Sequence, residues 1–338
     1  MKRILLAGGG TGGHITPLLA VKEALENKGE FKFMMIGSGL SDPGFKFKNI
    51  LTGKWRRYPD LKNFLDLIKI PLGMLQALWS ILWFMPNVCF AKGGYASVPT
   101  VIACRLLFIP IIIHDSDSVP GVSNKLLAYL AKKICLAYSG AEKYFYKPEK
   151  IVFTGNPVKK SIIKPKIKNN RPVILAMGGS QGSRFINEMI LALALQLLER
   201  ADVLHQVGRG NLSGTKLAGY QETEFIEDMG EAYAKADLVI TRAGANSLAE
   251  ISANKKPAII IPLPNSAQDH QLKNAYAYAQ NGAASVFEEE NLGPLTLYKD
   301  IIFYLDQPFR AKKMGEHAGE MNASDAAEKI ADLLIQYL

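Results

Sequence analysis

Short apolar runs alternate with longer mixed segments along the whole chain. The runs lie at 3–7, 31–36, 88–91, 109–114 and 134–137, and again at 172–177, 203–206, 237–241 and 258–262. Each run has the length of a strand, and the segments between them are long enough for helices. Strands of a parallel sheet are covered on both faces and are therefore apolar throughout. The pattern predicts an α/β protein made of parallel β-α-β repeats.

The chain length favours two domains. At 338 residues it exceeds the usual size of a single hydrophobic core. The apolar pattern stops at 156–171, which is rich in Lys, Pro and Asn. We predict Rossmann-like domains at 1–157 and 172–338 joined by a linker at 158–171, and leave open that the last helix packs back on the first domain. Ligands of parallel sheets bind beyond the carboxyl ends of the strands, so we expect two sheets that face a central cleft.

A glycine-rich loop follows the first predicted strand of each half. The loops are Gly8–His14 and Gly178–Ser183, with helices expected to begin near Thr16-Pro17 and near Arg184. Backbone amides at such a helix start suit a phosphate group. No acidic residue ends the second strand at 31–38. This absence disfavours a dinucleotide site.

Composition narrows the class of protein further. Hydrophobic residues make up 48% and charged residues 21%, as in a folded protein, and the net charge of +9 favours anionic partners. The three cysteines are too scattered to indicate disulfides or a zinc site, which fits a reducing cytoplasm. The apolar N-terminal stretch is too short for a signal peptide. Basic residues do not gather with aromatic ones, so we expect no nucleic acid partner.

The segment from Leu65 to Ala91 is strongly apolar. Pro71 and Pro86 enclose 14 of its residues, fewer than the roughly 20 that a membrane span needs, so we expect a buried or interfacial helix. Two tryptophans and several basic residues suit an anionic membrane surface. They are Trp79, Trp83, Lys54, Arg56, Arg57, Lys62 and Lys69. Ordinary core packing is the alternative.

An ordered set of motifs spans nearly the whole chain. It consists of Gly9–His14, Lys92–Tyr95, Gly155–Val158, Gly178–Gly182, Thr223–Met229, Arg242–Glu250 and His270–Ala275. In this set the chain resembles the MurG family of inverting glycosyltransferases. The resemblance implies the GT-B fold and transfer of N-acetylglucosamine from UDP-GlcNAc to undecaprenyl-pyrophosphoryl-MurNAc-pentapeptide (lipid I), which forms lipid II. It also implies peripheral binding to the cytoplasmic face of the membrane through about Leu65–Phe84, with no required cofactor.

The resemblance also implies roles for individual residues. His14 would be the catalytic base, because inversion needs a group that takes a proton from the acceptor hydroxyl. Ser180 would contact phosphate, Ile226 the uracil, Glu250 the ribose, and Gln271 with His270 the sugar. The remaining implied binding residues are Thr11, Gly12, Gly13, Asn124, Lys159, Ala245, Asn246, Ser247, Leu248 and Ala249.

Two positions depart from the family pattern. The chain has His114-Asp115-Ser116-Asp117 where the family commonly has His-Glu-Gln-Asn, and Lys159 where it usually has arginine. Asp115 and Asp117 also have the spacing of a metal-nucleotide motif, although we expect no metal. The departures keep three alternatives open: a transferase with another glycolipid acceptor, a UDP-sugar epimerase, and a non-catalytic UDP-sugar-binding membrane adaptor.

Overall fold

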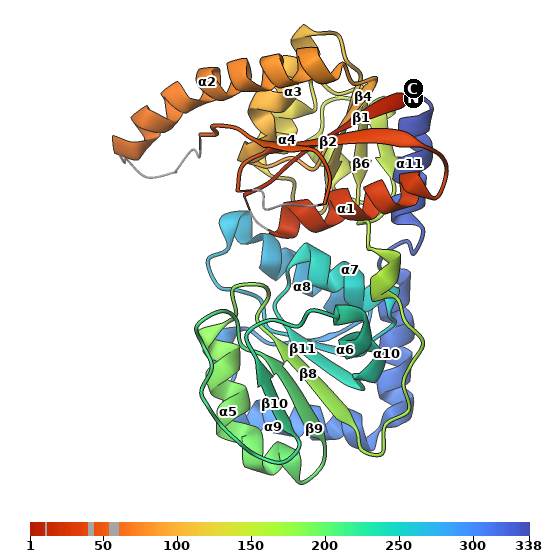
Figure 1. Ribbon diagram of the computed structural model, residues 1–338. Helices are drawn as coiled ribbons and strands as arrows, with labels where there is room; N and C mark the ends of the chain where they lie inside the picture. The colour runs from red at the N-terminus through yellow and green to blue at the C-terminus, as the bar shows by residue number, and fades with distance from the viewer. Residues whose placement is uncertain (11, 40–43, 54–60) are drawn as a thin grey trace. The chain divides into compact units, whose positions relative to one another are not determined.

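The computed structural model describes residues 1–338 except residue 11 and the segments 40–43 and 54–60 (Figure 1). The chain forms two compact units, and the first contains both ends of the chain. Unit 1 comprises Met1–Lys159 together with Asp325–Leu338, and unit 2 comprises Lys160–Ser324. Each unit contains one parallel sheet. The prediction of an α/β protein with two Rossmann-like units is confirmed.

Unit 1 contains a seven-stranded sheet in the order β3-β2-β1-β4-β5-β6-β7, and every neighbouring pair is parallel. The strands are β1 (Lys2–Ala7), β2 (Phe31–Gly37), β3 (Phe47–Asn49), β4 (Val88–Ala91), β5 (Ile111–Asp115), β6 (Lys133–Leu136) and β7 (Ile151–Phe153). The order changes direction at β1, where the chain crosses from β3 to β4. A parallel sheet binds ligands at such a switch point.

Helices cover both faces of this sheet (Figure 1). On one face, Ile4 and Leu6 pack with α1 (Gly12–Glu26) and α11 (Ala326–Ile335). On the other, Leu5 and Ala7 pack with α2 (Leu61–Phe84), α3 (Val98–Leu106) and α4 (Val122–Leu127). Successive side chains of a strand point to opposite faces, so β1 is apolar at every one of these positions.

Two helices begin earlier than predicted. Helix α1 begins at Gly12 rather than near Thr16, so Pro17 lies within it, and α2 begins at Leu61 rather than after Pro71. Proline removes one amide donor from a helix, but packing along the neighbouring turns can maintain the helix through it. Helix α2 therefore has 24 residues. Among the described residues, no helix combines the length and the apolar character needed to cross a bilayer.

Unit 2 contains a six-stranded parallel sheet in the order β10-β9-β8-β11-β12-β13. The strands are β8 (Val173–Met177), β9 (Asp202–Gln206), β10 (Tyr220–Thr223), β11 (Leu238–Thr241), β12 (Ala258–Ile260) and β13 (Ser285–Val286). Its α-helices are α5 (Arg184–Leu198), α6 (Met229–Lys235), α7 (Ala245–Ala253), α8 (His270–Gln280), α9 (Pro294–Asp306) and α10 (Pro308–Glu320). Helices α5 and α9 share a core with β8, β9 and β11.

The segment predicted as a linker packs on unit 2. Ile167 donates a backbone hydrogen bond to Ala234 O (2.9 Å), and Lys166 forms an ion pair with Asp237 (2.6 Å). A short 3-10 turn, Lys160–Ile162, begins the segment. Residues 160–171 therefore belong to the second compact unit.

Candidate functional site

In unit 1, polar side chains gather at the carboxyl ends of the central strands. Lys92 directly follows β4, and His114 lies near the end of the adjacent strand β5. Lys92 Nζ lies 3.0 Å from His114 Nδ1, and His114 Nε2 lies 2.9 Å from Gly155 O. An ammonium group can only donate, so Nδ1 accepts and Nε2 carries the proton that is donated to Gly155. His114 is therefore held as one neutral tautomer.

Asp115 organises the loop after β5. One carboxylate oxygen accepts from the backbone amide of Asp117 (3.0 Å), and the other accepts from Gly121 N (3.3 Å) and Asn124 Nδ2 (2.7 Å). Asn124 Nδ2 also donates to His114 O (3.1 Å). Burial and the charge of Asp117 raise the pKa of Asp115. The aspartate at this departure from the family pattern thus holds Asn124 in place.

His14 lies in the first turn of α1, beside the same cluster. A Cβ atom at Gly94 would lie 2.9 Å from His14 Nε2, and Gly94 has φ of 72°, so glycine allows the imidazole to approach. Burial and then the positive charge of Lys92 lower the pKa of His14 to about 4, against a smaller opposing effect of Asp117. At neutral pH the ring is uncharged and can accept a proton.

The other predicted residues of unit 1 have simpler settings. Gly12 and Gly13 occupy the first turn of α1 next to His14. Thr11 lies outside the described residues. Lys159 is half-buried at the last position of the first segment of unit 1.

In unit 2, a buried arginine connects the glycine-rich loop to the neighbouring strand ends. Arg242, just after β11, donates to Ser183 Oγ (2.6 Å) and to the carbonyls of Ile261 (3.1 Å) and Pro262 (3.2 Å), and forms an ion pair with Glu289. Ser183 caps α5 by accepting from Ile186 N (3.3 Å). Ser180 lies exposed in this loop, and α5 begins at Arg184 as predicted.

Ile226, which is predicted to contact the uracil, is held in place by Gln206. Ile226 N donates to Gln206 Oε1 (2.9 Å), while Gln206 Nε2 donates to Gly179 O (3.1 Å). Gln206 ends β9 and so links the segment after β10 to the glycine-rich loop after β8.

The predicted diphosphate and ribose residues lie on α7. Ala245, Asn246 and Ser247 form its first turn and are partly exposed, whereas the side chains of Leu248 and Ala249 are buried. Glu250 Oε2 accepts a hydrogen bond from the hydroxyl of Tyr233 (3.1 Å), a fully buried residue of α6. Burial and the Glu250 charge raise the pKa of Tyr233, so the phenol stays a donor.

The predicted sugar-reading residues begin α8. Gln271 Oε1 accepts a hydrogen bond from Leu263 N (3.1 Å). The two donors of this side chain are on its NH₂ group, on the other side of the amide. His270 Nδ1 lies 2.7 Å from Ala267 O, so this nitrogen carries the proton. Both side chains are partly exposed.

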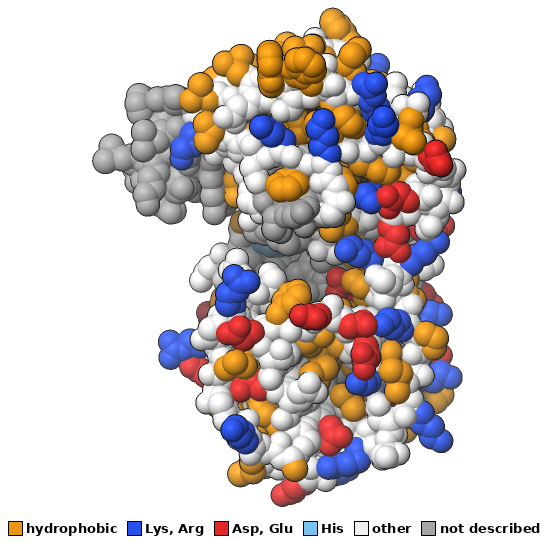
Figure 2. Space-filling model, viewed as in Figure 1, with side chains coloured by type: hydrophobic (Ala, Val, Ile, Leu, Met, Phe, Trp, Pro, Cys, Tyr) orange, Lys and Arg blue, Asp and Glu red, His pale blue; other side chains and the backbone are white. Residues whose placement is uncertain are grey.

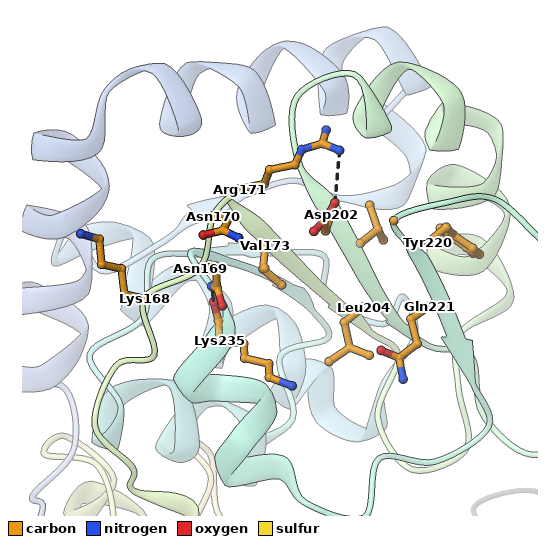
Figure 3. Close-up of a pocket in the computed structure, with 12 residues that line it drawn as sticks. Lys168, Asn169, Asn170, Arg171, Val173, Asp202, Leu204, Tyr220, Gln221 and Lys235 are labelled. Atoms are coloured by element: carbon orange, nitrogen blue, oxygen red, sulfur yellow. Dashed lines mark hydrogen bonds and ion pairs between the residues drawn. The ribbon is translucent and has the colours of Figure 1, made fainter.

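A cavity of about 760 Å³ lies elsewhere on unit 2 (Figure 3). Its lining includes Val173, Asp202 and Tyr220, the first residues of β8, β9 and β10, and the ion pair Arg171–Asp202 (3.4 Å) crosses it. This is the amino end of the sheet. Ligands of parallel sheets bind at the carboxyl end, so the cavity is separate from the candidate site.

Sequence reasoning did not assign roles to Lys92, Gln206, Tyr233 and Arg242. All four are buried and polar, yet each lies in or beside a strand or helix whose sequence otherwise looks like core. A buried cation directly after a strand, as at Lys92 and Arg242, is the signal that marks two of them.

Comparisons with known proteins agree with this arrangement. The model of the glycosyltransferase family 28 N-terminal domain matches residues 4–136, and that of the family 28 C-terminal domain matches residues 173–330. Two curated relatives are each named UDP-N-acetylglucosamine--N-acetylmuramyl-(pentapeptide) pyrophosphoryl-undecaprenol N-acetylglucosamine transferase. The one from Lachnoclostridium phytofermentans is 38% identical, covering 99% of this chain and 98% of the relative. The one from Clostridium kluyveri is 36% identical over the whole of both chains.

A solved structure is similar over the same extent. The crystal structure of Acinetobacter baumannii MurG is 28% identical and matches with a TM-score of 0.77 over 99% of this chain and 100% of that one. The GT-B fold expected from the sequence is thus confirmed. Two family models and full-length relatives agree with the ordered motifs, and the chain belongs to glycosyltransferase family 28, in its MurG family.

Proposed function

We propose that this protein transfers N-acetylglucosamine from UDP-GlcNAc to lipid I and so forms lipid II. The observation that carries the proposal is the full-length match to relatives named for this reaction, at 36–38% identity. It is supported by clusters of polar residues at the carboxyl ends of both sheets, where parallel α/β units bind their ligands.

In the proposed reaction His14 is the base. The acceptor hydroxyl attacks the anomeric carbon of the donor while His14 takes the hydroxyl proton, and the bond from that carbon to UDP breaks with inversion. A neutral imidazole is needed for this step, and the low pKa of His14 supplies it at neutral pH. Asn124, whose Oδ1 has no hydrogen bond among the described residues, would accept one from a substrate.

Unit 2 would bind the donor. The first turn of α7 would present amide groups to the diphosphate and stabilise the charge of the leaving UDP. Glu250 would accept hydrogen bonds from the ribose hydroxyls, and Ile226 would contact the uracil. Ser180 would reach a phosphate, and Gln271 with His270 the sugar hydroxyls.

We propose that the reaction needs no metal ion. Both carboxylate oxygens of Asp115 already accept hydrogen bonds within unit 1, so a hard cation would have to compete with these donors. Transfer should therefore continue in excess chelator. Loss of activity that added magnesium restores would contradict this.

We also propose that α2 binds the cytoplasmic face of the membrane. One side of the helix packs inward through Ala77, Ile81 and Phe84, while Trp79 (65% exposed) and Trp83 (71% exposed) face outward. Figure 2 shows apolar side chains gathered along this edge of unit 1, with Lys and Arg side chains nearby. An exposed apolar surface bordered by basic groups suits an anionic leaflet.

Sedimentation with anionic liposomes tests the membrane proposal. Replacing Trp79 and Trp83 together by serine should abolish most binding. Phe309→Ser is the matched control, because Phe309 is also exposed (77%) but lies on unit 2. Equal loss of binding in the control, or none in the double variant, would contradict the proposal.

The activity is tested with radiolabelled UDP-GlcNAc and synthetic lipid I. We expect label in the lipid product, and we expect His14→Ala to lose transfer while it keeps UDP binding, since donor residues lie on unit 2. Near-normal turnover of His14→Ala would eliminate the proposed base. No transfer by the unmodified protein, with UDP binding intact, would indicate another acceptor.

A further inference from the structure

Lys92 is a buried charge next to the proposed base. Its side chain is 2% exposed, and its ammonium group donates to His114 Nδ1 (3.0 Å). Burying a charge is costly unless nearby groups compensate it. The compensation comes from Asp115 and Asp117, whose charges both favour the ammonium form, although burial lowers the pKa of Lys92 to about 8.

The groups around His14 come from two loops. The loop after β4 supplies Lys92, and the loop after β5 supplies Asp117, with Asp115 and His114 behind it. A Cβ atom at Gly8 would lie 3.5 Å from His14 O and 3.6 Å from Lys92 Cβ, so His14 and Lys92 pack against the same point of the backbone. His114 is held neutral, and its pKa is lowered by burial and by Lys92. Among the described residues, the positive charge of Lys92 lowers the pKa of His14 and the carboxylate of Asp117 opposes it.

We propose that Lys92 is a positioning residue that keeps the His14 imidazole neutral when anionic substrates bind. The inference rests on the proposed function, in which both donor and acceptor carry a diphosphate. Negative charge near an imidazole favours its protonated form, and a protonated His14 cannot accept a proton. The ammonium group of Lys92 opposes that effect from inside the fold. Its hydrogen bond to His114, which is in turn tied to Gly155, fixes where the charge lies.

Direct titration of His14 tests this without any activity measurement. The protein has five histidines, so ring-labelled histidine gives a short NMR spectrum in which His14 is assigned by its absence from His14→Asn. In the unmodified protein we expect the His14 ring to stay neutral from about pH 8 down to about pH 5, with or without UDP. In Lys92→Met, which removes the charge but keeps an apolar stem, its pKa should rise by roughly one unit, and further when UDP is added.

Two other variants complete the test. Asp117→Asn removes the opposing charge at a partly exposed position and should shift the His14 titration to lower pH, which keeps the test decisive if Lys92→Met does not fold. Lys256→Met is the matched control. Lys256 is also buried with a pKa lowered to about 8, but it lies in unit 2 and donates to Ala236 O (2.9 Å). The control should leave His14 unchanged.

Enzyme kinetics then connect the charge to the reaction. In Lys92→Met the acidic limb of the pH profile of kcat/KM should move to higher pH by the same amount as the His14 titration. Lys92→Arg should return this limb to its position in the unmodified protein. An unchanged His14 titration in Lys92→Met and Asp117→Asn would overturn the inference, even in an active enzyme. A shifted titration in a protein that transfers no sugar would instead defeat the proposed function and leave the electrostatic role of Lys92 standing.

Discussion

The hydrogen bond between Tyr233 and Glu250 provides a quantitative test of the donor site. Tyr233→Phe removes only a hydroxyl that lies 3.1 Å from Glu250 Oε2 and keeps the shape of a fully buried ring. Glu250 is partly exposed, so water can replace the lost donor, but the carboxylate loses one of the hydrogen bonds that orient it. A hydrogen bond of this kind contributes about 0.5–1.5 kcal/mol. We therefore expect UDP to bind about 2- to 12-fold more weakly.

Isothermal titration calorimetry with UDP measures this change. Tyr278→Phe is the control, because Tyr278 is also buried and its hydroxyl bonds to Leu248 O (3.0 Å) and Ser252 Oγ (2.7 Å) of the same helix α7. It should leave the affinity for UDP within about twofold, since Glu250 keeps its partner. A UDP analogue that lacks the ribose hydroxyls should bind the unmodified protein and Tyr233→Phe equally. Unchanged UDP affinity in Tyr233→Phe, or equal weakening in both variants, would refute the reasoning.

Three further predictions concern other parts of the structure. Arg242→Lys keeps the charge but loses the planar donor group that reaches two carbonyls and Ser183, so binding of UDP-GlcNAc should weaken roughly tenfold in calorimetry; unchanged affinity would count against a role for this buried arginine. Leu334→Ala should destabilise unit 1 by about 2–5 kcal/mol in urea denaturation, because Leu334 is fully buried against α1; a loss below about 1 kcal/mol would mean that α11 does not complete the core. Burial lowers the pKa of His205 to about 4, so the unfolded state takes up the proton first as pH falls below about 6.5. Stability should therefore fall by about 2 kcal/mol from pH 7.5 to pH 5 through this group, and His205→Gln should show that much less pH dependence; equal pH dependence in both proteins would exclude it.

The sequence pattern predicted the central strands well, because buried parallel strands are continuous apolar runs. It missed strands of two to four residues at or near the sheet edges, such as Phe47–Asn49 and Ser285–Val286, since so few residues show no periodicity. It also started α2 after Pro71, because a local rule for proline does not include the packing that maintains the helix through that residue.

For the site, the sequence indicated the loops but not the contacts inside them. Lys92 and His114 are 22 positions apart and meet only because β4 and β5 are neighbours in the sheet. Tyr233 reaches Glu250 from a different helix, and the apolar pattern of its own helix does not indicate the partner of its hydroxyl. Such pairs depend on strand order and helix placement, which composition and spacing do not determine.

The return of α11 to unit 1 has a consequence for biosynthesis. Ile330, Ala331 and Leu334 complete the core around α1, and Lys2 Nζ donates to Leu338 O at the other end of the chain. A ribosome makes the first 159 residues early, but it makes α11 only after the whole of unit 2. Unit 2 is then complete in sequence while unit 1 still exposes the apolar surface of α1. The nascent first half should need chaperone protection until α11 is made, and a stop codon near position 324 would leave that surface permanently uncovered.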